Sequence, residues 1–147
     1  MATVNQADYL TFLRNVAGVP VSALPDASTY ITTTYNLALA LVSLDLNCIN
    51  TDVYCLAVYN CATDRLIGMA PDQTGQTFFA DARNGYGLNS FVAGVVSASG
   101  DESTNQSLAV PDALSNLTLM DMGMIKTPFG RAYLEFAQML GTNWGLS

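Results

Sequence analysis

The chain has 147 residues, the size of one ordinary domain, and half of them are apolar while only 12% are charged. This composition excludes a disordered chain, and it leaves more apolar surface than a small monomer needs, so we expect part of that surface to lie in a protein interface. The net charge is −7 and the five basic residues are scattered, which excludes the clustered Lys and Arg that binding to nucleic-acid phosphates requires.

The first two predicted helices follow from periodicity and from capping residues. Residues 6–17 place apolar side chains on one helical face. These side chains are Tyr9, Phe12, Leu13 and Val16. Asp26 or Ser28 can cap a second helix that we expect to end near Asp45. Residues 47–50 are then expected to form a short connection.

The third predicted helix is strongly apolar. Thr51 can cap it, and it should extend to about Met69, where Pro71 follows. Apolar side chains occur on most of its faces, which predicts a helix buried centrally or at a subunit contact. Residues 74–83 form either a short helix or an irregular segment.

Residues 91–110 differ from the rest, because β-branched residues and glycines occur at the start of this range without a helical period. We expect a strand from Phe91, a turn or loop over 100–105, and a returning strand from Gln106 to Val110. Together they predict a β-hairpin or an extended arm. The Ser, Gly, Asp and Asn content of its tip predicts a mobile segment that a neighbour orders on assembly.

The last helix has a clear start, since Thr127 supplies a capping hydroxyl and Pro128 follows in the first turn. Gly141 should stop it. Its buried stripe is expected to consist of Tyr133, Phe136, Ala137 and Leu140. Residues 112–126 before it fit several conformations.

The predicted fold is mainly α, with a bundle of about four to five helices. It occupies 1–147 as a single domain, because no repeat or linker divides the chain. A β-hairpin or extended arm is inserted near 91–110, and a C-terminal tail covers about 142–147.

No residue pattern indicates an enzyme. Histidine is absent, which removes the usual general base and the commonest zinc ligand. Cys61 has Arg65 four residues on, but a small core residue is the favoured interpretation of this cysteine. Asp101 and Glu102 are interpreted as a solvated acidic loop rather than a catalytic or metal site. We therefore expect no enzymatic activity, no cofactor and no metal.

The cysteines and the apolar runs bear on where the chain is found. Cys48, Cys55 and Cys61 are odd in number and match neither a disulfide framework nor a CxxC pair, so we expect free thiols. The first eight residues lack a basic start and an apolar run, and we expect synthesis in the cytosol without a secretory peptide. The apolar run 37–46 is too short to span a bilayer.

Five segments, taken in order, resemble the head-to-tail connector, or adaptor, proteins of tailed bacteriophages. They are Tyr9–Phe12, Leu24–Ser28, Tyr54–Asn60, Val95–Asp101 and Lys126–Tyr133. The most specific feature is Ser-Ala-Ser-Gly followed later by Thr-Pro-Phe-Gly-Arg. The resemblance covers most of the chain.

This resemblance implies a helical bundle with a β-arm that forms a ring, commonly of about twelve copies, on the portal with the tail machinery below. It implies location in the virion neck between capsid and tail, with the portal protein, a tail or nozzle protein and further copies of itself as partners. The apolar surplus would be subunit interface, and the acidic balance would line a channel through which DNA passes without sticking. No catalytic residue, no sequence-specific nucleic-acid binding and no membrane contact are implied.

Assembly contacts are expected on the arm and the tail. They are Val95, Ser97, Ser99, Asp101, Glu102, Asn105 and Trp144. Trp144 is either an anchor folded back on the domain or one docked on a partner. The helical surface over 53–69 and the stripe over 133–140 are expected to be core or subunit contacts.

Two alternative classes stay open. The first is another phage neck or tail protein, such as a tail terminator or a capsid cement protein. The second is a cytosolic module that binds a small ligand. A ring would favour assembly, whereas a monomer whose melting temperature rises with ligand would favour the binding module.

Overall fold

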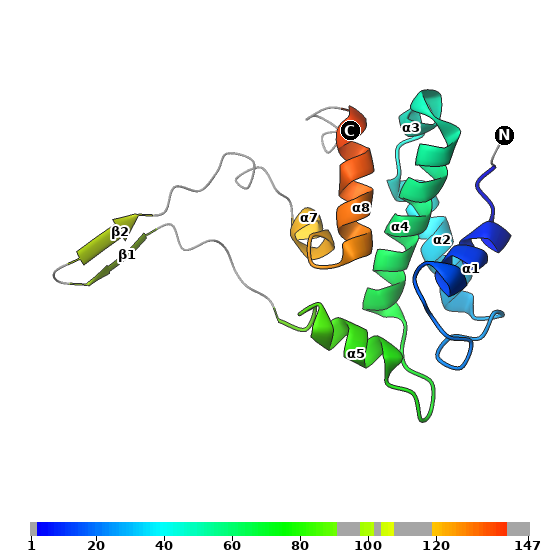
Figure 1. Ribbon diagram of the computed structural model, residues 1–147, viewed down its shortest axis with the longest axis horizontal. Helices are drawn as coiled ribbons and strands as arrows, with labels where there is room; N and C mark the ends of the chain where they lie inside the picture. Colours follow the sequence, from blue (N-terminus) through cyan, green and yellow to red (C-terminus); the bar gives the residue numbers. More distant parts are fainter. Residues whose placement is uncertain (1–2, 91–97, 102–103, 108–118, 141–147) are drawn as a thin grey trace.

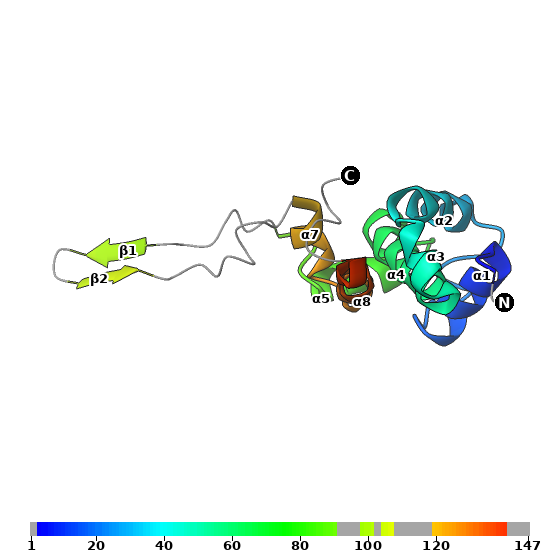
Figure 2. The same cartoon turned by 90° about the horizontal axis from the view of Figure 1, so that it is seen from above.

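The computed structural model describes residues 3–90, 98–101, 104–107 and 119–140. These residues are mainly helical, as predicted, and α4 (Thr51–Met69) is the central helix of a helical body. The helices that pack against α4 are α1 (Gln6–Asn15), α2 (Thr29–Leu41), α3 (Asp45–Ile49), α5 (Phe78–Gly85) and α8 (Pro128–Ala137). Both views place α1 and α8 on opposite sides of α4 (Figures 1 and 2).

Two shorter elements complete the helical body. Helix α7 (Leu119–Met124) leads into α8, and the 3-10 turn η1 (Gln138–Leu140) continues α8 and contacts α3. In the part of the chain that the structure describes, no helix combines the length and the apolar character needed to cross a membrane.

Side-chain caps fix the helix starts. The four caps are Asn5, Ser28, Asn50 and Thr127, and each accepts a hydrogen bond from a backbone N–H of the first turn. From the sequence, either Asp26 or Ser28 could cap α2. Ser28 is the cap, because Asp26 instead pairs with Arg14 at 2.5 Å. The prediction of Thr51 as a cap is wrong, since Asn50 takes that role and Thr51 is already helical.

The second predicted helix ends earlier than expected. Helix α2 stops at Leu41, and Val42 adopts an extended backbone with its side chain buried in the core. The chain then forms α3 over 45–49, where a connection was predicted. Propensity favours a helix through Val42, but burial of its branched side chain outweighs this local preference.

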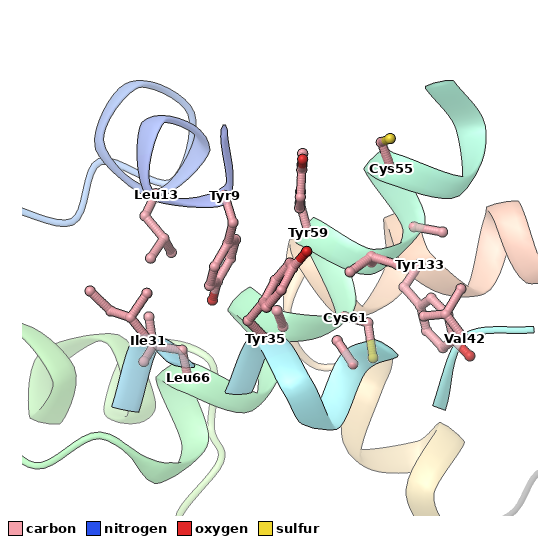
Figure 3. Close-up of a cluster of buried hydrophobic side chains, with 14 of the residues drawn as sticks. Tyr9, Leu13, Ile31, Tyr35, Val42, Cys55, Tyr59, Cys61, Leu66 and Tyr133 are labelled. Carbon is pink, nitrogen blue, oxygen red and sulfur yellow. The ribbon is translucent and has the colours of Figure 1, made fainter. Parts of the chain in front are cut away.

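Tyrosine rings from three helices form the middle of the core (Figure 3). The ring of Tyr9 lies 5.8 Å from that of Tyr35 and 5.9 Å from that of Tyr59, measured between centroids. Most of α4 is buried, so the prediction of a centrally buried helix is confirmed and its side chains are core. The predicted inner face of α1 is partly wrong, because Val16 is 63% exposed.

The stripe predicted for the last helix holds in part. Tyr133 and Ala137 are buried, while Phe136 and Leu140 are partly buried and pack against the core. Leu134, which the stripe did not include, is buried as well. A helix beside α4 therefore uses a wider apolar face than the predicted stripe.

A two-stranded hairpin lies inside the range 91–110. Strand β1 (Ala98–Asp101) pairs antiparallel with β2 (Thr104–Ser107), with Ala98 opposite Ser107. The second strand begins two residues before the predicted Gln106. Both views place this hairpin away from the helical body (Figures 1 and 2). The other residues of the predicted arm and the predicted tail lie outside the described residues.

The junction between α7 and α8 leaves no room for a side chain at Gly130. A Cβ on Gly130 would lie 2.7 Å from the Cα of Met124 and closer still to its carbonyl oxygen. Gly130 is also the residue whose N–H bonds to the Thr127 cap at 2.8 Å. The sequence at this junction is therefore constrained by backbone packing.

We expect Gly130→Ala to lower the free energy of unfolding by about 1–3 kcal/mol, because the added methyl group must displace backbone atoms. Gly68→Ala is the matched control, since nothing lies within 4 Å of a Cβ there and alanine favours the helix by about 0.5–1 kcal/mol. Urea unfolding followed by circular dichroism measures both. A Gly130→Ala protein as stable as the wild type would contradict the close packing.

Candidate functional site

A groove of about 670 Å³ lies beside α4, next to the two points where the segment 91–118 leaves and rejoins the helical body. From α2 and α4 its lining residues are Leu37, Leu41, Asp64, Arg65, Gly68 and Met69. From α5, the turn after it and α7 they are Arg83, Leu88, Asn89, Met120 and Gly123. The groove is thus mostly apolar, with three charged side chains.

Lys126 ties together the two chain segments that flank the insertion. Its Nζ donates to the carbonyl oxygens of Gly87 at 2.8 Å and Ser90 at 2.5 Å. The Asn89 amide donates to the side-chain oxygen of Asn84 at 2.6 Å, which adds a second contact on the same turn. Ser90 is the last described residue before the insertion, so its exit point is fixed to the chain that follows α7.

Arg83 has a structural role at the end of α4. Its Nη1 donates to the carbonyl oxygens of Ala70 at 2.7 Å and Ile67 at 3.2 Å, where the helix dipole favours a cation. Its Nη2 lies 3.7 Å from the carboxylate of Asp72, which also accepts from the backbone N–H of Phe79 at 2.7 Å. This guanidinium therefore already has acceptors within the fold.

Asp64 is a buried carboxylate that joins α4 to α8. It accepts a hydrogen bond from the hydroxyl of Thr127, the residue that caps α8. Burial raises the pKa of Asp64 above its ordinary value, and the hydrogen bond from Thr127 and the charge of Arg65 only partly oppose this. The carboxylate is thus a costly group to keep charged in this position.

Arg65 has buried hydrogen-bond donors that lack an acceptor among the described residues. Its Nε lies 4.0 Å from an oxygen of Asp64, which is the limit of an ion pair. Its Nε and Nη2 are buried and have no hydrogen-bond partner among the described residues. Leaving buried donors unsatisfied is unfavourable, and a carboxylate matches the geometry of a guanidinium. These two atoms have almost no accessible surface, so only the rest of the Arg65 side chain, which is 26% exposed overall, can meet an acceptor that enters the groove.

The surroundings of Cys61 argue against a reactive thiol at this position. Burial raises the pKa of this thiol to about 12, although the guanidinium of Arg65 opposes the shift. A thiol that stays protonated is a poor nucleophile, so the interpretation as a core residue is supported. All three cysteines are free, with Cys48 exposed and Cys55 buried.

The structure places only part of the predicted assembly residues. Three of them lie in the hairpin, and these are Ser99, Asp101 and Asn105. The others lie outside the described residues, and these are Val95, Ser97, Glu102 and Trp144. Asn105 stands opposite Gly100 in the register, next to the pair that Ser99 forms with Gln106. Where the chain is described, no group of three or more Cys, Asp or Glu side chains is arranged to hold a metal ion.

The groove was not predicted from the sequence. Arg65 was considered only as a neighbour of Cys61, and Leu37, Leu41 and Met120 had no predicted role at a site. The signal that was available is an arginine within a helix that is apolar on most faces, because a buried cation needs a partner.

Comparisons with known proteins return no relative. No protein-family model matches the chain, and no match is found among the curated proteins or the solved structures. The likeness to phage connector proteins therefore depends on the sequence segments given above, and the function is argued below as a proposal.

We expect Asp64→Asn to raise the free energy of unfolding at pH 7. Because the pKa of Asp64 is raised in the folded state, its contribution to stability is full below about pH 3.8, the ordinary value, and is lost as pH rises through the folded-state pKa. The amide oxygen of the introduced asparagine can still accept from Thr127. The difference in the free energy of unfolding between the wild type and the Asp64→Asn variant should therefore shrink as the pH falls toward about 3.8.

Urea titrations from about pH 3 to pH 7 measure this dependence. The exposed Asn15→Ala variant, which changes no titratable group, is the control and should follow the wild-type pH profile. An Asp64→Asn protein that is less stable than the wild type at pH 7 would mean that Thr127 and Arg65 stabilise the charge more than burial opposes it.

Thiol titration should separate the three cysteines. In the folded protein one thiol should react rapidly, because Cys48 is exposed while Cys55 and Cys61 are buried with raised pKa values. All three should react after unfolding. The Cys48→Ser variant should lose the rapid reaction, and rapid modification of two or more thiols in the folded protein would contradict the burial of the pair.

Proposed function

We propose that the protein is a head-to-tail adaptor of a tailed bacteriophage, which forms a homo-oligomeric ring beneath the portal and joins it to the tail. The observation that carries the proposal is the hairpin of β1 and β2, placed away from the helical body on a segment whose root is held by Lys126. A fixed root and a distant hairpin suit a contact with a neighbouring subunit.

The hairpin offers backbone groups to a partner. A two-stranded hairpin has two outer edges, and it is marginally stable in water by itself. Strand addition to a neighbouring sheet would satisfy the backbone N–H and C=O groups of those edges. This mode of contact is compatible with the mixed polar sequence of β1 and β2.

The charge distribution supports a role beside DNA without binding to it. The net charge is −7, and four of the five basic side chains already donate to acceptors inside the protein. These four are Arg14, Arg83, Lys126 and Arg131. Phosphate binding needs free clustered cations, so DNA would pass such a surface with little attraction.

The experiment is binding to a portal protein encoded beside this chain. Deleting 98–107 should leave the helical circular dichroism signal nearly unchanged, because the helices lie outside the deletion, and should weaken portal attachment by roughly tenfold or more. Gln106→Pro removes a strand N–H, so it should also weaken attachment, while the matched Gln106→Ala should not.

Electron microscopy of the mixture and co-sedimentation measure attachment. Full attachment of the deletion variant would show that the hairpin is not the contact. Failure of the intact protein to bind any portal or tail component would overturn the adaptor function itself. A terminator or a cement protein would instead be located at the tail tube or on the capsid shell.

One observation favours the alternative of a small-ligand module. The groove volume of about 670 Å³ lies in the range of about 300–1,000 Å³ that ligand pockets occupy. A monomer whose melting temperature rises with a small ligand, and whose rise is lost in Gly68→Trp, would favour that function over the adaptor.

A further inference from the structure

The surface around α3, beside the start of α4, is apolar and acidic, and we call it the α3 end. It consists of Leu44, Asp45, Ile49 and Asp52. Leu44 is 69% and Ile49 is 53% exposed, and both belong to the short stretch of chain at α3. Asp45 and Asp52 are exposed and form no ion pair within the described residues.

The α3 end lies at the start of α4, whereas the groove extends from Leu41, at the end of α2, to the last turns of α4. Helix α3 precedes the start of α4, while Arg65 and Met69 belong to its last turns and α5 follows it. Figure 1 shows α3 and α5 at opposite ends of the body. Two surfaces so placed cannot meet within one molecule, but they can meet between two copies.

The two surfaces also have complementary needs. The groove has apolar walls, including Leu41 and Met120, and it contains the partly exposed side chain of Arg65, whose nearest described carboxylate, that of Asp64, lies 4.0 Å from its Nε. The α3 end has exposed apolar side chains together with the carboxylates of Asp45 and Asp52, which pair with no cation among the described residues. Since the other four basic residues already have acceptors, Arg65 is the cation of this chain that is best placed to receive a carboxylate from another copy.

We propose that the α3 end of one copy docks into the groove of the next copy. Leu44 and Ile49 lie against the apolar walls, and Asp45 or Asp52 accepts hydrogen bonds from Arg65. This contact is heterologous, so every copy keeps one free surface of each kind until the arrangement closes into a ring. The inference deepens the proposed self-assembly and rests on it, and it assigns the subunit contact to surfaces other than the hairpin.

The test uses two variants that each destroy one surface. Leu44→Glu with Ile49→Glu places charges on the α3 end, and both positions are exposed, so the fold should tolerate them. Gly68→Trp fills the groove from a position where nothing lies within 4 Å of a Cβ, and Met69→Glu is a second groove variant. Val16→Glu changes an equally exposed apolar residue away from both surfaces and serves as the control.

Sedimentation velocity and light scattering of the full chain give the result. The wild type and Val16→Glu should assemble, while the α3-end variant and the groove variants should need roughly tenfold or higher concentration. An equimolar mixture of the α3-end variant with the groove variant should form a dimer and nothing larger, because each supplies one intact surface. Circular dichroism checks that each variant is folded.

Three outcomes would overturn the contact: a wild type that stays monomeric, variants that assemble like the wild type, or a mixture that forms no dimer. The adaptor function is judged separately by portal binding and by the hairpin deletion. If the variants assemble and attach to the portal normally, this contact is rejected and the adaptor function stands. If the wild type assembles through these surfaces but binds no portal, the contact stands and the adaptor function is rejected.

Discussion

The hydroxyl of Thr127 makes two hydrogen bonds that join α8 to the central helix α4. The hydroxyl oxygen accepts a hydrogen bond from the N–H of Gly130 and so caps the start of α8. The same hydroxyl donates a hydrogen bond to the buried carboxylate of Asp64 in α4. One side chain thus fixes the beginning of α8 against the central helix. Lys126, the residue before it, then fixes the root of the insertion, and the adjacent groove lies between these constraints. The position of the groove follows from this junction.

Much of the fold could be predicted where local chemistry and burial agree. The end of α4 at Met69 and the Thr127 cap of α8 followed from an apolar segment, a capping hydroxyl and nearby prolines, and the structure confirms them. The end of α2 was wrong because Val42 leaves the helix to bury its side chain. Such a choice depends on which other helices supply the surrounding surface, and no local pattern contains that information. The cap at Asn50 was missed although asparagine is the stronger N-cap of the two adjacent candidates.

The candidate site was less predictable than the fold. Strand residues without a helical period are a local signal, and β1 and β2 lie within the range 91–110 that carries it. The groove is built from segments as far apart as Leu37 and Gly123, and only packing brings them together. Arg65 could have been noticed as a cation in an apolar helix, but its unmet donors become apparent only once the positions of Asp64 and its neighbours are known.

The net negative charge of the chain opposes association between its copies. Copies that each carry −7 repel one another at long range, although salt reduces this beyond about 10 Å at 0.1 M ionic strength. A contact must therefore gain its free energy at short range. In the proposed contact between copies, apolar burial and the pairing of Arg65 with a carboxylate would do this at the helical body. The hairpin strands contain one aspartate and no basic residue, so their backbone groups can pair with a neighbour almost independently of net charge. An acidic, apolar chain with few cations available is thus suited to contacts made by apolar burial and backbone pairing, which is what the proposed ring around DNA would require.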